Sequence, residues 1–331
     1  EYFDYDQKYN FRDRDALVLG KVVGDIQKSF NQFWTSNLSV PVEQRFDGIG
    51  LFKKNVSVND DEVLVVYRGL HEYAQSAENF EPEIRRAITD IPLAFKELSN
   101  NIVWTDAKFV SDNPGKNDNT LALDGGGLTT SALAVLIKQA REEIVIQSPY
   151  LVMSVEALVL FKEAANRGIK ISISTNSLAS TDNLQAFSGY RNQRQELNDM
   201  GLQIYEYQPY PEVQRQLLER YPELKDKQPV FAIHAKTIVI DSRIVYIGTY
   251  NLDPRSQNLN TEVGIIVNNE TLAKFVQERI AVDMQPGNSW KASDDPDKHA
   301  SIRRRFKLRK RFGGHDQVRR LDNDYLPGLL Y

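Results

Sequence analysis

Short apolar stretches alternate with stretches of helical periodicity through the middle of the chain. Apolar residues that recur every three to four positions predict helices, whereas short runs rich in Ile and Val predict strands. The predicted helices span about residues 130–142, 154–166 and 182–200, and the predicted strands span residues 144–147, 169–175 and 202–207. Gly168 and Gly201 are expected to stop the second and third helices. This alternation predicts an α/β fold with a mixed, mostly parallel sheet flanked by helices.

A second apolar region surrounds a histidine and a lysine. Residues 230–233 and 237–240 are apolar and largely β-branched, and they predict one buried strand that carries His234 and Lys236 between them. Side chains two positions apart on a strand share a face, so the imidazole and the ammonium are expected to point at one spot. Such a pair can move a proton or attack at a phosphate while neutralising its oxygens.

The residues after this strand add a carboxylate, a hydroxyl and an amide. Asp241 lies an odd number of positions from His234 and Lys236, so on a strand its side chain would point to the opposite face. It also ends the apolar stretch, and it is therefore expected to accept hydrogen bonds at a turn. A further strand over residues 244–248 is expected to bring Thr249 and Asn251 beside the pair, where both can bind phosphate oxygens.

The N-terminal residues weakly repeat the order of residues 262–280. Each segment has an acidic residue, an apolar strand, a turn and an amphipathic helix, with the first strand predicted at residues 16–19 and the turn at Gly20. The repeat places Asp15 opposite Glu262. The apolar stripe of the first helix contains Val23, Ile26, Phe30, Phe33 and Trp34.

Composition shifts divide the chain further. Residues 1–40 form the partial repeat, residues 41–105 are polar and predict a mostly helical connector, residues 106–285 hold the α/β pattern, and residues 286–331 form a basic tail. The triple glycine at 125–127 lacks the frame of a phosphate-binding loop, which favours a plain turn over a phosphate cradle.

Cysteine and histidine usage limits the chemistry. The chain has no cysteine, which excludes disulfides and thiolate metal sites, and its four histidines are too scattered to predict a zinc site. No apolar run approaches the roughly 18 residues that a membrane span requires. No transmembrane segment, metal or cofactor is therefore expected.

The tail differs in charge from the rest of the chain. Residues 286–331 carry a net charge of +5, whereas residues 1–285 carry −9. A basic cluster in the tail can bind an anionic lipid surface, or it can be an ordinary solvated run of charges. The two interpretations are equally favoured. Nucleic acid is the weaker alternative, because few aromatic residues are interleaved there. The cluster consists of Arg303, Arg304, Arg305, Lys307, Arg309, Lys310 and Arg311.

The residues around the pair resemble the phospholipase D superfamily. Its HKD pattern is HxKxxxxD followed by GSxN and a later acidic residue, and His234, Lys236 and Asp241 match the first part. Residues 248–251 read GTYN, in which Thr249 replaces the usual Ser and keeps the hydroxyl as a candidate phosphate ligand.

Further motifs are similar to the bacterial cardiolipin synthase branch of that superfamily. These are NLDPRSQNLNTE at 251–262, SPY at 148–150 and TNSLASTD at 175–182, in which Asn176 is a second candidate phosphate ligand. Phe187 stands where these relatives usually have His, which leaves headgroup selectivity open.

The resemblance implies a two-step phosphodiester exchange without a metal. One histidine becomes phosphatidylated while another protonates the leaving alcohol, and water or a second alcohol then removes the group. It implies that His234 is the general acid and base rather than the nucleophile. It also implies that Glu262 accepts a hydrogen bond from the His234 ring, and that Lys236 and Asn251 stabilise charge on the phosphate.

The branch has two HKD motifs, but this sequence contains one. We therefore expect half of an active site in a phospholipase D-like layered fold, whose second repeat is complete and whose first is partial. Asp15 is then the orienting residue for a histidine that belongs to residues before Glu1. A homodimer that pairs two copies of His234 is the alternative, and the partial repeat in residues 1–40 argues against it.

The resulting function is a phosphatidyltransferase of the cardiolipin synthase type, with phosphatidylglycerol or phosphatidylethanolamine as substrate. Its expected location is peripheral, on the bacterial inner membrane. One alternative is a phosphodiesterase or nuclease of the same superfamily. Another is a catalytically incomplete lipid-surface-binding chain.

Overall fold

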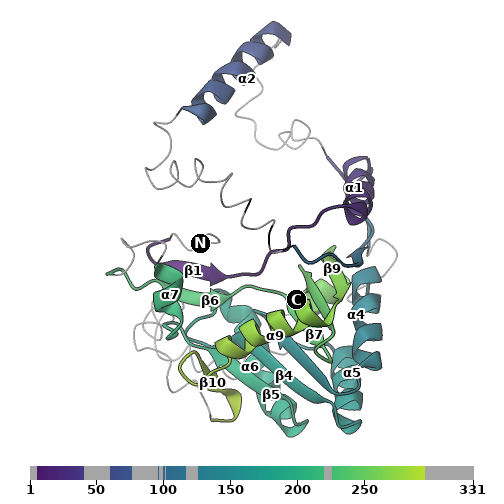
Figure 1. Cartoon of the computed structure of the whole chain (residues 1–331), viewed down its shortest axis with the longest axis vertical. Helices are drawn as coiled ribbons and strands as arrows, with labels where there is room; N and C mark the ends of the chain where they lie inside the picture. Colours follow the sequence, from purple (N-terminus) through teal and green to yellow (C-terminus); the bar gives the residue numbers. More distant parts are fainter. Residues whose placement is uncertain are drawn as a thin grey trace, which may run out of the picture. The chain divides into compact units, whose positions relative to one another are not determined.

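The computed structural model describes residues 6–40, 60–76, 96, 100, 102–116, 126–219 and 226–294 (Figure 1). The chain divides into two compact units, one formed by residues 1–38 with 105–331 and the other by residues 39–104. In the second unit, helix α2 (Asp60–Gln75) lies in the predicted connector. Most of that connector and the basic cluster at 303–311 lie outside the described residues, so those predictions stay predictions.

The first unit is built on an eight-stranded sheet. Across the sheet the order is β10 (Ser289–Lys291), β5 (Gln203–Tyr207), β4 (Lys170–Asn176), β3 (Glu143–Gln147), β7 (Thr237–Ile240), β8 (Ile244–Gly248), β9 (Val263–Asn268) and β2 (Ala107–Ser111). The predicted tail begins at residue 286, but β10 pairs with β5, so its first residues belong to the sheet.

The sheet is mixed, as expected, but the prediction that it is mostly parallel was wrong. Parallel pairing is confined to β3, β4 and β5, which are connected through helices. The other neighbouring pairs are antiparallel. Residues 241–243 link β7 to β8, and so short a link permits only a hairpin, whereas a parallel pair needs a crossover of a dozen or more residues.

Local capping explains where the helices begin and end. The side chains of Ser154, Asn183 and Asn269 each accept a hydrogen bond from a backbone N–H in the first turn of the following helix. Gly168 and Gly201 follow the ends of the second and third predicted helices with φ of 85° and 83°, which confirms them as stops. The helices of this unit are α1 (Lys21–Trp34), α4 (Leu128–Gln139), α5 (Val155–Asn166), α6 (Leu184–Asp199), α7 (Gln214–Leu218), α8 (Pro254–Asn258) and α9 (Glu270–Asp283).

Two apolar cores show that both faces of the sheet are covered. Ile144 and Ile146 of β3 join a core that includes buried residues of α4, α5 and α6. Val145, which lies between them in the strand, joins a second core with residues of α9. Alternate side chains of a strand point to opposite faces, so the helices pack on both sides of the sheet.

The N-terminal segment differs from its prediction. Residues 16–19 do not form a strand, and Leu17 and Leu19 are 66% and 50% exposed. The strand lies earlier, at β1 (Tyr9–Arg12), which pairs in parallel with β6 (Val230–Ile233) in a separate two-stranded sheet. Apolar composition alone could not place this strand, because its partner is more than 200 residues away in the sequence.

Candidate active site

His234 and Lys236 lie in the link between two strands of different sheets. The predicted single strand over residues 230–240 is divided into β6 and β7, and residues 234–236 have no strand geometry. The two side chains still meet, since the Lys236 Nζ atom lies 2.9 Å from Nδ1 and 3.0 Å from Nε2 of His234. The expected pair is therefore present, although a different local structure produces it.

Lys236 is buried, and its environment changes its basicity. Burial removes water from the ammonium and lowers the pKa of Lys236 to about 8. Nearby carboxylates oppose this shift, in the order Asp13, Asp182, Glu262 and Asp253. Most Lys236 side chains thus remain protonated at neutral pH, and they carry the positive charge that a phosphate requires.

The carboxylate beside His234 is Asp13, whereas Asp15 is exposed. Asp13 Oδ2 lies 2.8 Å from His234 Nδ1, and the ring of Phe11 lies 4.8 Å from the imidazole. Burial raises the pKa of Asp13, but the hydrogen bond to His234, the Arg14 backbone N–H and the nearby positive charges lower it further, so the net shift is downward.

Backbone pairing brings Asp13 to this position. The carbonyl oxygen of Arg12 accepts hydrogen bonds from the backbone N–H groups of His234 and Ala235, at 3.0 and 3.2 Å. The residue after Arg12 therefore lies next to His234. Asp15, which was predicted to orient a histidine that belongs to residues before Glu1, lies beyond the end of β1, and its side chain is exposed.

Two arginines, which the sequence did not single out, hold this segment on the main sheet. Arg12 Nε donates to Asp283 at 2.7 Å, and Gln147 Nε2 donates to the other oxygen of Asp283 at 2.8 Å. Arg14 donates to Gln147 at 2.8 Å and to Thr237 at 3.1 Å, and burial lowers the pKa of Arg14 to about 10. No motif contains Asp283, so only the fold reveals its role.

Glu262 is buried close to the pair but contacts a different partner from the one predicted. The hydroxyl of Thr249 donates to Glu262 Oε2, and the same hydroxyl accepts the backbone N–H of Val263 at 3.0 Å. Glu262 was expected to orient the His234 ring, whereas Asp13 is the carboxylate at hydrogen-bond distance from that ring.

The two asparagines have different environments. Asn176 exchanges two hydrogen bonds of 2.8 Å with the backbone of Ile233, so its amide positions β6. Asn251 is buried, and its Oδ1 atom has no hydrogen-bond partner among the described residues. A buried polar atom without a partner is costly, which suggests that Asn251 faces a ligand or water.

Asp241 has the turn role that its parity indicated. It has a φ of 51°, and its carboxylate accepts the backbone N–H groups of Arg141, Glu142 and Glu143 at 2.8–3.1 Å. These bonds join the β7–β8 turn to the start of β3. Within the part of the chain that the structure describes, no group of three His, Cys, Asp or Glu side chains could hold a metal ion.

Comparison with known proteins shows what part of this arrangement is similar to. The protein family described as "Cardiolipin synthase, PLD-like domain" matches residues 133–284, which include His234, Lys236 and Glu262. Residues 133–284 are a phospholipase D-like domain. Asp13 lies outside the matched residues, so the domain and the N-terminal segment both contribute to the site.

Relatives of the phospholipase D-like domain extend the similarity over most of the chain. An uncharacterised protein of Helicobacter pylori is 29% identical over 87% of this chain and 53% of its own length. Cardiolipin synthase C of Escherichia coli strain K12 is 28% identical over 87% of this chain and 58% of its own length. The chain thus spans a little over half the length of these relatives. Phosphatidylserine synthase of Haemophilus influenzae aligns with 66% of this chain and 46% of its own at 13% identity, with a TM-score of 0.42.

Phe187, the departure from the synthase pattern, packs inside the phospholipase D-like domain. Its ring lies 5.7 Å from that of Tyr190, and the guanidinium of Arg194 lies 5.6 Å from its centre. Across the described ranges, no helix combines the length and apolar character that crossing a bilayer requires.

Proposed function

We propose that this chain contributes one half of the active site of a phosphatidyltransferase of the cardiolipin synthase type. The contact of Lys236 with both ring nitrogens of His234, together with Asp13 at Nδ1, is the observation that carries the proposal. The ammonium neutralises phosphate oxygens, and the imidazole moves the proton. The second histidine comes from polypeptide beyond this chain, and we call this chain together with that part the assembled enzyme.

In the first step, the second histidine attacks the phosphorus of a lipid phosphodiester. A nitrogen–phosphorus bond forms as the bond from phosphorus to the leaving oxygen breaks, and His234 gives that oxygen a proton. In the second step, an acceptor alcohol gives its proton to His234 while its oxygen attacks phosphorus and the nitrogen–phosphorus bond breaks. Asp13 stabilises the imidazolium form of His234, which is present before the first step and is restored by the second.

The substrates of this proposal are phosphatidylglycerol or phosphatidylethanolamine as phosphatidyl donor and a lipid alcohol as acceptor. The basic cluster at 303–311 adds an attraction to an anionic membrane surface, with each cation contributing about 1 kcal/mol. The proposed location is peripheral, on the bacterial inner membrane, and this charge and the similarity to a cardiolipin synthase support it.

Transfer between lipids in vesicles tests the proposal. The assembled enzyme is expected to form diphosphatidylglycerol from phosphatidylglycerol, whereas the 331-residue chain alone is expected to form none. Release of phosphatidate without transfer would instead favour a phosphodiesterase. Product formed by the chain alone as a monomer would contradict the half-site, and product formed only by a dimer would favour pairing of two His234 residues.

A further inference from the structure

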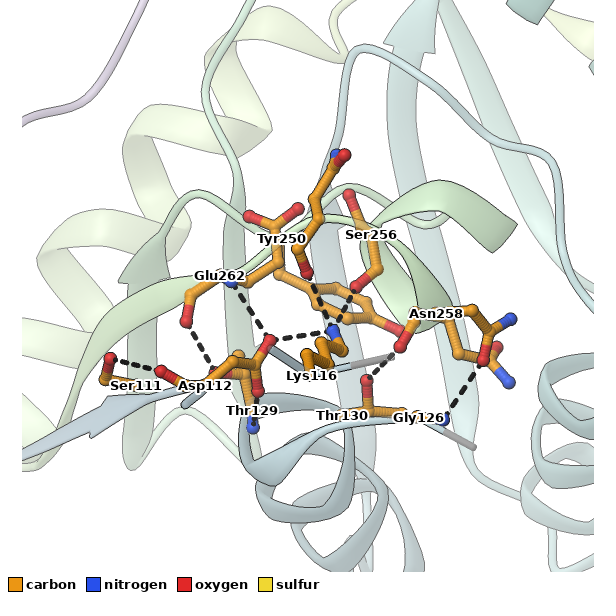
Figure 2. Close-up of polar contacts among 12 residues, drawn as sticks. Ser111, Asp112, Lys116, Gly126, Thr129, Thr130, Tyr250, Ser256, Asn258 and Glu262 are labelled. Atoms are coloured by element: carbon orange, nitrogen blue, oxygen red, sulfur yellow. Dashed lines mark hydrogen bonds and ion pairs between the residues drawn. The ribbon is translucent and has the colours of Figure 1, made fainter. Parts of the chain in front are cut away.

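We infer that Asp112 and Lys116, which lie outside the matched domain, form a buried clamp that positions Glu262 and the segment 249–262 for catalysis. Figure 2 shows this clamp between the start of α4 and the segment that carries Glu262. The inference rests on the proposed function in one respect only, namely that Glu262 and Lys236 act on a lipid phosphodiester. Asp112 and Lys116 are positioning residues, because neither is placed to touch substrate.

Lys116 binds the backbone of α8 and of the residues just after it. Its ammonium lies 2.7 Å from Asp112 Oδ2, and it donates to the carbonyl oxygens of Ser256 and Asn260 at 2.9 Å each. An ammonium has three protons to donate, so these partners satisfy it fully. The Lys116 side chain is 3% exposed, which leaves it no role as a surface charge or a ligand.

Asp112 connects this ammonium to Glu262. One carboxylate oxygen accepts the backbone N–H of Glu262 at 3.0 Å, and the other accepts that of Thr129 at 2.8 Å (Figure 2). The carbonyl oxygen of Glu262 is held as well, by the backbone N–H of Asp112 at 2.9 Å and the Thr129 hydroxyl at 3.0 Å. The backbone of Glu262 is thus bound on both sides, which directs its side chain toward Thr249.

Gly127 shows that the clamp is closely packed. A Cβ atom at Gly127 would lie 2.3 Å from Asp112 Oδ1 and 2.6 Å from Lys116 Cε, so only glycine fits there without displacing the pair. The neighbouring Gly126 N–H donates to Asn258 of α8 at 3.1 Å. Gly127 therefore allows close approach to the clamp, and the Gly126 N–H already has a partner.

A buried ion pair is costly and adds little net stability compared with apolar residues, so a clamp of this kind is best explained by the geometry that it imposes. The geometry reaches Lys236, because Glu262 is one of the carboxylates that raise the pKa of Lys236 against the effect of burial. Lys236 contacts His234, and the carboxylates of Asp13, Asp182, Glu262 and Asp253 raise its pKa electrostatically.

The test is a pH titration of Lys236 in the 331-residue chain. NMR on a sample with labelled lysines monitors it. The Lys236 signal is assigned by its loss in Lys236→Met. In Lys116→Met, Glu262 loses its anchor and moves away, so the Lys236 midpoint is expected to fall by about half a pH unit. Thr129→Val removes one bond to Glu262, and it is expected to shift the midpoint in the same direction by less.

Two controls separate positioning from general stability. Lys162→Met changes an exposed lysine of α5, and Leu197→Ala opens a cavity in the core; both should leave the Lys236 midpoint within about 0.1 pH unit of the unaltered chain. An unshifted midpoint in folded Lys116→Met overturns the clamp. If Lys116→Met does not fold, an unshifted midpoint in Thr129→Val overturns it.

The titration needs no substrate, so it separates the clamp from the proposed function. A shifted midpoint with no lipid transfer by the assembled enzyme would sink the proposed function and keep the clamp. Lipid transfer with an unshifted midpoint would sink the clamp alone.

Discussion

Asp13 and Glu262 reach the His234–Lys236 pair in two different ways. Glu262 is buried within the main sheet unit, and the short segment between β8 and β9 presents it. Asp13 is half-buried and comes from a strand more than 200 residues earlier, which pairs with β6 outside the main sheet. One carboxylate depends on contacts around the domain core, and the other depends on the attachment of a distant segment.

This difference shows what the site requires beyond its motif. Hydrogen bonds to the backbone of Glu262 hold it, through Asp112 and Thr129. Asp13 is held mainly through its neighbour Arg12, whose guanidinium pairs with the buried Asp283. Variants that loosen one support without the other can therefore separate the roles of the two carboxylates.

Removing the imidazole that Asp13 contacts should have the largest effect. His234→Ala is expected to lower lipid transfer by the assembled enzyme by about 100-fold or more, because general acid–base catalysis contributes at least that much. The free energy of unfolding should change little, since the ring is partly exposed and fills no core. Retention of more than about a tenth of the rate would contradict the assignment.

Weakening the contacts that hold Asp13 in place should mainly lower the free energy of unfolding. Asp283→Asn removes the charge that pairs with Arg12 at 2.7 Å and is expected to lower the free energy of unfolding by about 3 kcal/mol, as measured by urea denaturation. Asp25→Asn breaks the exposed pair with Lys28 and should have no measurable effect. Equal effects of the two changes would show that the buried pair does not anchor the segment.

Comparing Asp13 with Asp15 tests which carboxylate serves His234. Asp13→Asn keeps the shape but cannot stabilise the imidazolium, so transfer by the assembled enzyme should fall about tenfold or more. Asp15→Asn, at an exposed position two residues later, should stay within about twofold of the original rate. The reverse order of effects would show that Asp13 does not serve His234.

The smallest expected effect is the loss of about half the rate at pH 8. The pKa of Lys236 is lowered to about 8, chiefly by burial, so the ammonium that stabilises phosphate charge is present below pH 8 and is lost above it. Transfer should halve near pH 8 and then fall about tenfold for each further pH unit. Lys236→Arg keeps the positive charge, so any activity that this variant retains should not decline above pH 8. If the rate of the unaltered enzyme stayed constant up to pH 9.5, the Lys236 ammonium would not be the group that stabilises phosphate charge.

The sequence was most informative where the determinants are local. The helix stops at Gly168 and Gly201, the meeting of His234 with Lys236 and the turn at Asp241 all depend on neighbouring residues. The contact of Asp13 with His234 could not be predicted, because it depends on the pairing of β1 with the distant β6.

The direction of the strands and the clamp also depended on distant contacts. Alternating helices and strands are typical of parallel sheets, and the antiparallel pairs that β7, β8, β9, β2 and β10 form depart from that expectation. Asp112 and Lys116 are spaced like an ordinary surface pair, and their burial follows from the segment that covers them.

The central claim is that His234 transfers protons and that the nucleophilic histidine lies outside this chain. The direct measurement is to mix the assembled enzyme with a phosphodiester that has a good leaving group, quench it, and locate the phosphorylated residue by mass spectrometry. His234→Ala should still accumulate the adduct, because such a leaving group needs no acid. The account predicts the adduct on a histidine outside residues 1–331, and an adduct on His234 would contradict it.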